Sequence, residues 1–518
     1  MTRVFRNWES NSIILGLLLA LVVSASEIKS QDMKGMKMPS QQRPQTSQSP
    51  SPTPKPSPGQ MPNMPGMSMP QASPSPSEQT QMNMPGTEGG SMNAGSPLIM
   101  SGDKMAIRVG PRDQNVMFIG AMASGTSEQP ASSPMHMVHL GHGKWLFMLH
   151  YNLIVGINRQ GGLRGATKFE SANWFMPIAF HRLGPGTLQL RGMFSAEPFT
   201  FARGGSPLLF QTGETYKGQP LIDRQHPHDL FMELSARYTV PLGEQTTWFA
   251  YVGYPGEPAL GPPAFMHRTS ESENPSAPLA HHLQDSTHIS FGVFTTGFTY
   301  RWFELEGSIF NGREPDENRY NFEAHPWNSR SARLSFAPNA NWSMQISHSL
   351  LRNPETLEPG TTRRTTASIS YNKEIKRGNW AASLIWGRNH ENHGPREIFN
   401  LNGYTAESTI NFFDRNYLFT RLELVDKNDL LRLADRLRLG ISQSHPAFRV
   451  GAYTFGAVRD VWNANKVSLG IGGDLTFYST PTSLDSIYGS HPVSWRLFLR
   501  LRPAKMKMDK HAMHDVHK

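Results

Sequence analysis

The sequence predicts an all-β fold: a transmembrane antiparallel β-barrel of about 16 strands, preceded by a disordered N-terminal arm. From residue 144 onward, segments of about ten residues alternate apolar and polar side chains, as strands with two different faces do. A tilted strand of that length crosses the hydrocarbon layer of a membrane, whereas strands of globular proteins average about five or six residues. The connections alternate between tight turns and long loops, and the strand count is even, as in outer-membrane barrels.

The candidate strands begin near residues 145, 168, 187, 229, 246, 288, 301, 331, 341, 363, 378, 403, 416, 446, 466 and 493. The clearest is KVSLGIGGDLTFYS, in which Leu469, Ile471 and Leu475 alternate with Ser468 and Asp474. A soluble β-sandwich or a propeller would show the same period, so these two folds are the alternatives to the barrel.

The connections divide the strands into pairs. Tight links such as RLGPG, PLGEQ, APNAN and DRN follow the even-numbered strands. Long links follow most of the odd-numbered strands: Thr200–His228, Glu257–Thr287, Gly312–Ser329, Asn389–Asn402, Asp426–His445 and Thr480–Pro492. Short periplasmic turns and long external loops place both chain termini in the periplasm.

The start of the chain indicates export. Residues 1–25 are predicted to be a secretory signal peptide, because Arg3 and Arg6 precede a short apolar run and small residues follow it. The chain contains no cysteine, which fits an oxidising envelope compartment. We therefore expect the protein in the cell outer membrane of a Gram-negative-type bacterium, in contact with its lipid.

Composition divides the rest of the chain. Residues 26–101 form an arm of Pro, Ser, Gln, Gly and Met that cannot bury enough apolar surface to fold. Residues 102–143 are a periplasmic N-terminal segment or a plug, with a short strand expected near 115–121. Residues 144–502 form the barrel, and residues 503–518 form a tail rich in His and Met.

Methionine and histidine gather in three segments that the topology places on one side of the membrane. The predicted donors are Met33, Met36, Met38, Met61, Met64, Met67, Met69, Met82 and Met84 in the arm, Met135, His136, Met137, His139 and His142 before the barrel, and Met506, Met508, His511, Met513, His514 and His517 in the tail. Thioethers and imidazoles are the ligands that Cu(I) prefers, and silver resembles it in softness. The alternatives are a plain linker and a sink for oxidants, since methionine sulfoxide is reversible.

Other histidines lie in the predicted external loops. In DRQHPHDLF, His226 and His228 stand beside Asp229, where a long loop re-enters the barrel. They are candidates for a divalent metal site or, as the favoured interpretation, for a structural corner. The stretches HHLQDSTH and NHENH also fall in external loops, which in porins often fold inward and narrow the lumen.

Charge and motifs exclude other classes. The net charge of +9 is not clustered with aromatic residues, so no nucleic-acid site is predicted. No serine-hydrolase, zinc-protease, phosphate-binding or dinucleotide motif occurs, so we do not expect an enzyme. Charged residues of both signs are expected to face the lumen: Arg449, Arg459, Arg496, Arg500 and Arg502 near the last strands, and Glu233, Glu304 and Glu306 elsewhere.

A signal peptide, a methionine-rich arm with MxxM spacing from Met33 to Met92, and a barrel together resemble the copper resistance protein B family. That resemblance implies an outer-membrane protein that helps to keep periplasmic copper low. The stretches MASGTSEQPASSPMHM and LFQTGETYKGQPLIDRQHPHDLFMEL look like an uncharacterised barrel group found near metal-efflux systems, which implies periplasmic efflux components as partners. A homotrimer is a further expectation, because porins are often trimers.

The sequence thus predicts an outer-membrane barrel that binds copper or silver through its periplasmic tails and contributes to metal tolerance or efflux. One alternative is a general porin or small-solute channel whose arm is a passive linker, and another is an envelope scaffold whose proline-rich arm binds a partner.

Overall fold

A computed structural model describes residues 97–102, 104–110, 115–394, 397–464 and 466–506. The predicted signal peptide and the methionines of the arm lie outside the described residues. So do Met508, His511, Met513, His514 and His517 of the tail.

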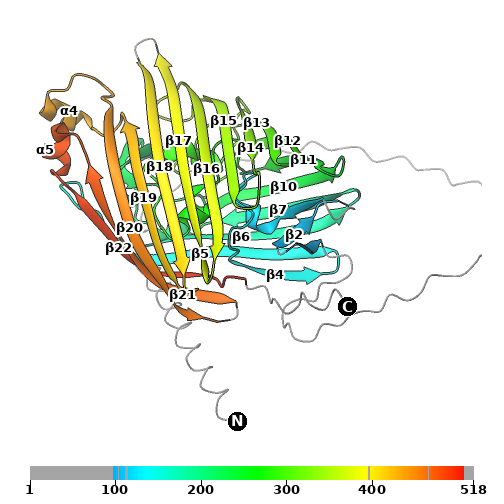
Figure 1. The fold of residues 1–518 in the computed structure, drawn as a ribbon. Helices are drawn as coiled ribbons and strands as arrows, with labels where there is room; N and C mark the ends of the chain where they lie inside the picture. The colour runs from blue at the N-terminus through cyan, green and yellow to red at the C-terminus, as the bar shows by residue number, and fades with distance from the viewer. Residues whose placement is uncertain (1–96, 103, 111–114, 395–396, 465, 507–518) are drawn as a thin grey trace, which may run out of the picture. The chain divides into compact units, whose positions relative to one another are not determined.

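The described residues form a closed barrel of antiparallel strands, and this confirms the predicted fold (Figure 1). Sixteen strands make up its wall, and each follows its neighbour in the chain. They are β5 (Trp145–Arg159), β6 (Thr167–Leu183), β7 (Gly186–Phe194), β10 (Phe231–Pro241), β11 (Thr246–Gly253), β12 (Val293–Tyr300), β13 (Phe303–Phe310), β14 (Ser329–Phe336), β15 (Trp342–Arg352), β16 (Thr361–Ile375), β17 (Gly378–Gly394), β18 (Glu397–Phe412), β19 (Asn416–Lys427), β20 (Phe448–Asn463), β21 (Val467–Ser479) and β22 (Val493–Pro503).

The barrel closes between its first and last wall strands. β22 pairs with the second half of β5, from Leu501 opposite Leu153 to Trp495 opposite Arg159. A short strand, β4 (Met137–His142), pairs with the first half of β5. β4 and β22 therefore share one edge of β5.

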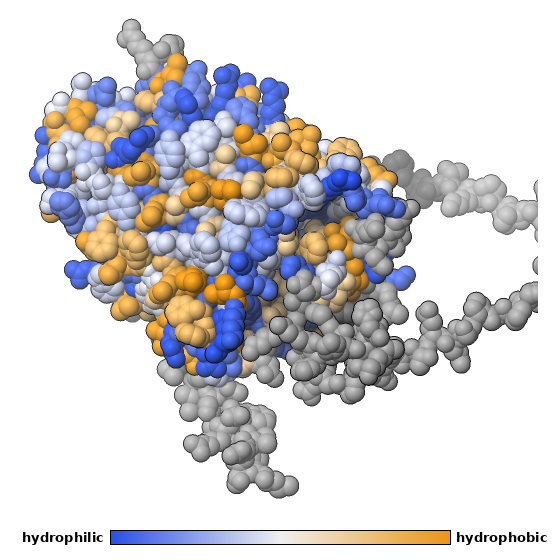
Figure 2. All heavy atoms as spheres, in the orientation of Figure 1, coloured by the Kyte–Doolittle hydropathy of each residue, from blue (hydrophilic) through white to orange (hydrophobic). Residues whose placement is uncertain are grey.

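The wall has its apolar side chains outside and its polar side chains inside. Leu384 and Leu497 on the outer face are 61% and 60% exposed. Thr295, on the inner face, is fully buried. Figure 2 shows apolar residues spread over the face of the wall in view. Among the described residues, no helix has the length and apolar character to cross a membrane.

The connections alternate as predicted, with one correction. The link Asn389–Asn402 is not a long loop, because β17 and β18 continue to pair up to Gly394 opposite Glu397. His390 and His393 therefore stand on β17. Both strands extend well past their neighbours, as Figure 1 shows for β17 and β18.

Two further expectations differ from the structure. Arg449 and Arg459 face outward, because the inward positions beside them on β20 are taken by the buried Val450 and Val458. The predicted end of the arm at residue 101 is four residues late, since Leu98–Ser101 form strand β1 and pair with β2 (Lys104–Arg108). β2 pairs in turn with β3 (Val116–Phe118).

Shorter elements stand in the connections. The loop after β7 carries α2 (Glu197–Thr200) and a hairpin of β8 (Ser206–Tyr216) with β9 (Gln219–Gln225). The loop after β11 carries η3 (Phe265–His267), η4 (Thr269–Glu271), α3 (His281–Gln284) and η5 (Ser286–His288). The remaining short elements are η2 (Ile119–Ala121), α4 (Leu433–Leu439), η6 (Thr482–Leu484) and α5 (Asp485–Tyr488).

Candidate metal centre

The long loop between β11 and β12, residues 254–292, lies inside the barrel. It is anchored to inward-facing side chains on several sides of the wall. Arg333 of β14 donates to the carbonyl oxygen of Gly261 at 3.1 Å, and Arg421 of β19 pairs with Glu271 at 2.5 Å. Glu273 pairs with Arg500 and Arg502 of β22. We call this segment the inward loop.

Residues 115–133 also lie against the inner wall. Ser343 of β15 donates to the carbonyl oxygen of Glu128 at 3.0 Å, and Asn372 of β16 donates to that of Ser132 at 2.7 Å. On another strand, β7, Arg191 donates to the carbonyl oxygen of Ala123 at 2.9 Å. Residues 115–133 thus occupy the lumen beside the inward loop.

Five histidines from these loops surround one point inside the barrel. His226 and His228 follow the β8–β9 hairpin, whereas His281, His282 and His288 belong to the inward loop. The imidazole centroids of His226 and His228 are 6.4 Å apart, and those of His228 and His288 are 5.4 Å apart. The centroid of His281 lies 5.1 Å from that of His288 and 5.3 Å from that of His282. The centroids of His282 and His226 are 6.3 Å apart. These contacts form a closed circuit, which we call the histidine ring.

Acceptors beside the ring fix each imidazole, and four of them are carboxylates. His226 bonds Glu214 at 2.7 Å, His228 bonds Glu197 at 2.7 Å, His281 bonds Asp285 at 2.6 Å and His282 bonds Glu314 at 3.2 Å. His288 instead contacts the carbonyl oxygen of Asp285 through Nδ1 at 2.9 Å. An acceptor on one ring nitrogen fixes the orientation of the imidazole and, where it binds Nδ1, leaves Nε2 as the free donor.

Burial controls the protonation of the imidazoles in the histidine ring. Burial lowers the pKa of His226, His281 and His288, and the pKa values of His226 and His288 lie well below the ordinary value. Burial acts the same way on His228, but the carboxylate of Glu197 outweighs it and raises the pKa of that imidazole. His226, His281 and His288 are therefore neutral at neutral pH, which is the state in which imidazole binds metals.

A glycine of the β8–β9 hairpin makes room for the ring. Gly213 has a φ of 127°, and a Cβ added there would lie 2.5 Å from the Nε2 and Cε1 atoms of His282. Any larger residue would displace that imidazole.

Asp229 forms its ion pair with a residue outside the histidine ring. Its carboxylate pairs with Arg319 at 3.1 Å, and burial raises its pKa to about 7. His226 also contacts the carbonyl oxygen of Pro227 through Nδ1 at 3.0 Å, so both of its ring nitrogens are engaged. Of the sequence-predicted trio His226, His228 and Asp229, the structure therefore brings the two histidines into the ring and turns the aspartate to a salt bridge.

Methionines gather beside the ring in one apolar cluster, the methionine cluster. The thioether of Met193 lies 3.4 Å from Nε2 of His267 on the inward loop. The buried members with sulfur are Met105, Met137, Met148, Met176, Met193 and Met232, and Met117, Met122, Met135, Met266 and Met506 pack against them. The larger apolar cluster at the other side of the inward loop, around Phe210 and Tyr488, contains no methionine.

Two of the predicted donor segments meet at this cluster. The amide of Met506 donates to the carbonyl oxygen of Met135 at 3.0 Å, and His136 contacts the carbonyl oxygen of Pro503 through Nδ1 at 3.2 Å. Met137 is buried in the cluster, whereas His142 at the end of β4 is exposed. His139 lines a groove on the apolar outer face of the wall.

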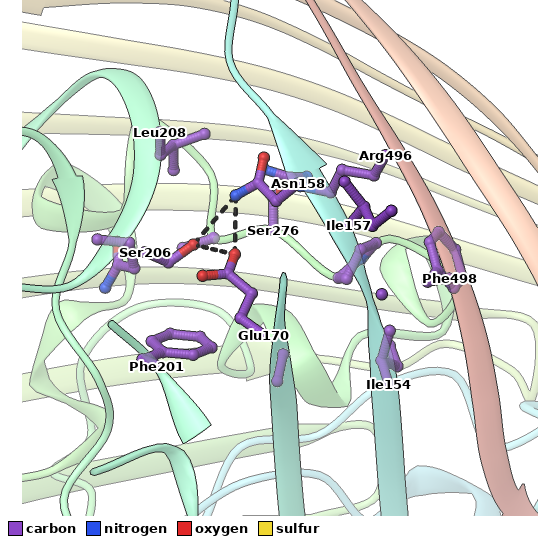
Figure 3. Close-up of a pocket in the computed structure, with 15 residues that line it drawn as sticks. Ile154, Ile157, Asn158, Glu170, Phe201, Ser206, Leu208, Ser276, Arg496 and Phe498 are labelled. Carbon is purple, nitrogen blue, oxygen red and sulfur yellow. Dashed lines mark hydrogen bonds between the residues drawn. The ribbon is translucent and has the colours of Figure 1, made fainter. Parts of the chain in front are cut away.

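A small cavity of about 50 Å³ with a mixed apolar and polar lining lies between β5, β6 and the inward loop (Figure 3). Glu170 accepts hydrogen bonds there from Asn158 at 2.8 Å and from Ser206 at 2.6 Å, and Arg496 lines its far side. A space of this size holds a water molecule or two.

The donors that the structure brings together are imidazoles, the carboxylates that contact them, and a cluster of thioethers beside them. In the described part of the chain, no group of three or more His, Asp or Glu side chains has the arrangement of a complete metal site. Sequence reasoning missed the ring as a unit because its members come from two loops far apart in the chain. The signal that would have revealed the methionine cluster is methionine at inward positions of strands, for example Met148, Met176 and Met193.

No family model and no curated protein sequence matches the chain. Among solved structures, an anion-selective porin from Comamonas acidovorans is 9% identical, with a TM-score of 0.41, and the match covers 69% of this chain and 99% of the porin. OmpT of Vibrio cholerae is 6% identical, with a TM-score of 0.39 and coverage of 70% and 99%. OccAB1 of Acinetobacter baumannii is 10% identical, with a TM-score of 0.35 and coverage of 70% and 97%.

Proposed function

We propose that the chain is an outer-membrane β-barrel that binds copper or silver ions and contributes to metal tolerance or efflux. The membrane part of the proposal is supported by the polarity of the wall. Its outer face carries Leu384, Leu497 and similar side chains, while its inner face carries Arg333, Glu407 and Arg500. A water-soluble barrel would show the opposite arrangement, because apolar surface is removed from water on folding.

The metal part rests on one observation, the junction of Met135 with Met506. It joins two methionine-bearing segments at the periplasmic end of the proposed topology, and both side chains pack on the methionine cluster. Methionine is also a common filler of irregular cores. Methionines that only filled gaps in the core would be spread over the molecule. The other large core cluster, around Phe210 and Tyr488, contains no methionine. Concentrated thioethers favour a soft monovalent ion.

The same topology sets the partners. Tight turns at one end of the barrel place the start of β5 and the end of β22 there, so the arm and the tail extend into the periplasm in this proposal. Periplasmic metal-efflux components are the partners that would receive or supply ions at that end. The proposal includes a homotrimer embedded in outer-membrane lipid. It includes no catalytic activity.

A second candidate function is a channel for small solutes with a passive arm. The observation that favours it is the inward loop itself, whose Arg268 and Glu273 pair with wall residues across the lumen. Loops folded inward narrow the passage in channels and select solutes by charge.

A tolerance assay tests the proposal. The full-length chain is expressed in a copper- and silver-sensitive Gram-negative host, beside a variant with Met135→Leu, Met137→Leu and Met506→Leu and a control with Met344→Leu on β15. We expect the chain in the outer-membrane fraction and higher silver tolerance for the wild type and the control than for the triple variant. A chain recovered in the soluble periplasm, or equal tolerance of the host with and without it, contradicts the proposal.

A further inference from the structure

Two imidazole nitrogens of the histidine ring have no partner. Nε2 of His228 and Nε2 of His288 are buried, and neither has a hydrogen-bond partner among the described residues. The residues are 5% and 9% exposed, so water reaches them poorly. Buried polar atoms of a native protein are satisfied as a rule, and an exception calls for a water molecule, an ion or another ligand.

The two rings are prepared to share such a ligand. Nδ1 of His228 is held by the carboxylate of Glu197 at 2.7 Å, and Nδ1 of His288 by the carbonyl oxygen of Asp285 at 2.9 Å. In the neutral form of each imidazole the acceptor binds the Nδ1 hydrogen, so the lone pair is on Nε2. The ring centroids are 5.4 Å apart. Metal–imidazole bonds of about 2.0 to 2.1 Å allow one ion to bridge two rings at this separation.

A soft third donor stands nearby. His267 of the inward loop contacts the sulfur of Met193 at 3.4 Å. His267 is close enough to His228 and His288 that a charge on either imidazole acts on it. Phe265, two residues earlier, stacks with His228 at 6.1 Å and shields the pair from solvent.

The chemistry of these donors selects the ion. Calcium and magnesium need oxygen ligands, yet the nearby carboxylates of Glu197 and Asp285 are already bound to imidazole or guanidinium groups. Zinc needs four ligands in tetrahedral geometry, which the described residues do not assemble. Two imidazoles with a thioether beyond them suit Cu(I) or Ag(I), and His228, whose pKa is raised by Glu197, releases its Nε2 proton when the ion binds.

Beyond Met193, further methionines lie on the neighbouring strands of the inner wall. Met193 lies near the end of β7, next to the long loops, while Met176 lies in the middle of β6 and Met148 near the start of β5. Met137 of β4 stands opposite His150, as Met176 does from the other side of β5, and Met135 and Met506 pack in the same cluster. Thioethers are uncharged and release soft ions readily, so a row of them suits transfer between sites rather than storage.

We infer that His228 and His288 bind a single Cu(I) or Ag(I) ion inside the barrel, and that Met193 is the first of the thioethers that accept it. This inference deepens the proposed function and rests on it. It differs from a site in the tails, because the ion is bound within the wall.

Crystals of the full-length mature protein soaked with Ag(I) test the inference directly. We expect an anomalous-difference peak between Nε2 of His228 and Nε2 of His288. Peaks at the tails alone would overturn the inference while leaving the proposed function in place. Crystals in which no silver binds would overturn both.

Full-chain variants give a solution counterpart. X-ray absorption of the protein with one equivalent of Cu(I) should show nitrogen and sulfur ligands in the wild type and sulfur only in His228→Gln/His288→Gln. His348→Gln is the matched control, because that histidine is exposed on the outer face of β15. Circular dichroism and heat-modifiable migration verify that each variant is a folded barrel. Nitrogen ligation that persists in the double variant would overturn the inference.

Discussion

The backbone amide of Met506 donates a hydrogen bond to the carbonyl oxygen of Met135 at 3.0 Å. The two residues are separated by the whole barrel in sequence, yet this bond holds the beginning of the tail against the segment that leads into β4. It brings together side chains that the sequence places in two different donor segments. Both side chains also pack on the methionine cluster, so the junction connects the tail with the inside of the barrel.

Replacing the two sulfurs at this junction should weaken copper binding without unfolding the barrel. Leucine and methionine have similar volumes, and such exchanges usually cost less than about 1.5 kcal/mol. We expect Met135→Leu/Met506→Leu to lower Cu(I) affinity in a chelator competition while its urea midpoint stays close to that of the wild type. Met344→Leu serves as the control. Unchanged affinity would separate the junction from metal binding.

Neutralising Glu273 should release the inward loop. This carboxylate is fully buried and faces Arg500 and Arg502, with an oxygen 2.9 Å from Nη1 of the latter. Removing one partner of a buried ion pair costs about 3–5 kcal/mol. Glu273→Gln should therefore lower stability and raise the conductance of the barrel in planar bilayers.

The control for Glu273 is an ion pair on the surface. Arg377 and Asp414 are 3.0 Å apart but 60% and 49% exposed, and such pairs contribute about 0–1 kcal/mol. Asp414→Asn should leave both stability and conductance at wild-type values. Equal effects of the two variants would show that the inward loop is not held by Glu273.

Glu257 should make the docking of the inward loop depend on pH. Burial raises the pKa of its carboxyl group from 4.5 to about 8, although Ser124, Arg333 and Arg191 favour its ionised form. Because the pKa is raised in the folded state, the stabilisation is complete below pH 4.5 and decreases as the pH rises to about 8. At about 1.4 kcal/mol per unit, the loss is a few kcal/mol.

Hydrogen exchange across this range measures the effect. Amides of residues 115–133 and of the inward loop should exchange faster as the pH approaches 8, beyond the intrinsic increase. Glu257→Gln has no ionisable group at this position. The difference in exchange rate between this variant and the wild type should therefore change as the pH rises to about 8 and stay constant above it. Parallel profiles of the two proteins at every pH would contradict the assignment.

If the apolar outer face lies in a bilayer, the free-energy cost of a charged side chain on it should depend on how deep in the bilayer that side chain lies. Leu384, in the middle of β17, is 61% exposed, and Ile398, near the tip of β18, is 50% exposed. Arginine on the lipid face costs about 2–4 kcal/mol at the midplane of a bilayer and about 0–1 near its edges. Leu384→Arg should therefore destabilise the folded barrel in vesicles much more than Ile398→Arg. A small cost at both positions would argue against immersion.

The strands could be predicted because apolar and polar side chains alternate along every wall strand. Ile471 and Leu475 point out and Asp474 and Thr476 point in, so one short segment suffices to recognise the pattern. The prediction failed where that pattern changes. β17 and β18 pair beyond the expected wall through polar residues such as Asn389 and Asn402, which sequence alone reads as a loop.

The interior could be predicted only in part. HHLQDSTH and DRQHPHDLF stand out in sequence, but their meeting depends on how two long loops fold back into the lumen. Hydrogen bonds such as Arg364 to the carbonyl oxygen of His282 fix that path. These contacts join residues far apart in the chain, and no local pattern encodes them. The methionines of β5, β6 and β7 alternate along their strands as other apolar residues do, so the sequence does not set them apart.

The central claim is that the protein binds soft metal ions, and a Cu(I) titration of the refolded, full-length mature chain against a chromophoric chelator tests it most directly. The account predicts binding that competes with the chelator, retained in His348→Gln and reduced in both the His228→Gln/His288→Gln and the Met135→Leu/Met506→Leu variants. A wild-type chain that leaves all copper with the chelator would contradict the account and favour a channel for other small solutes.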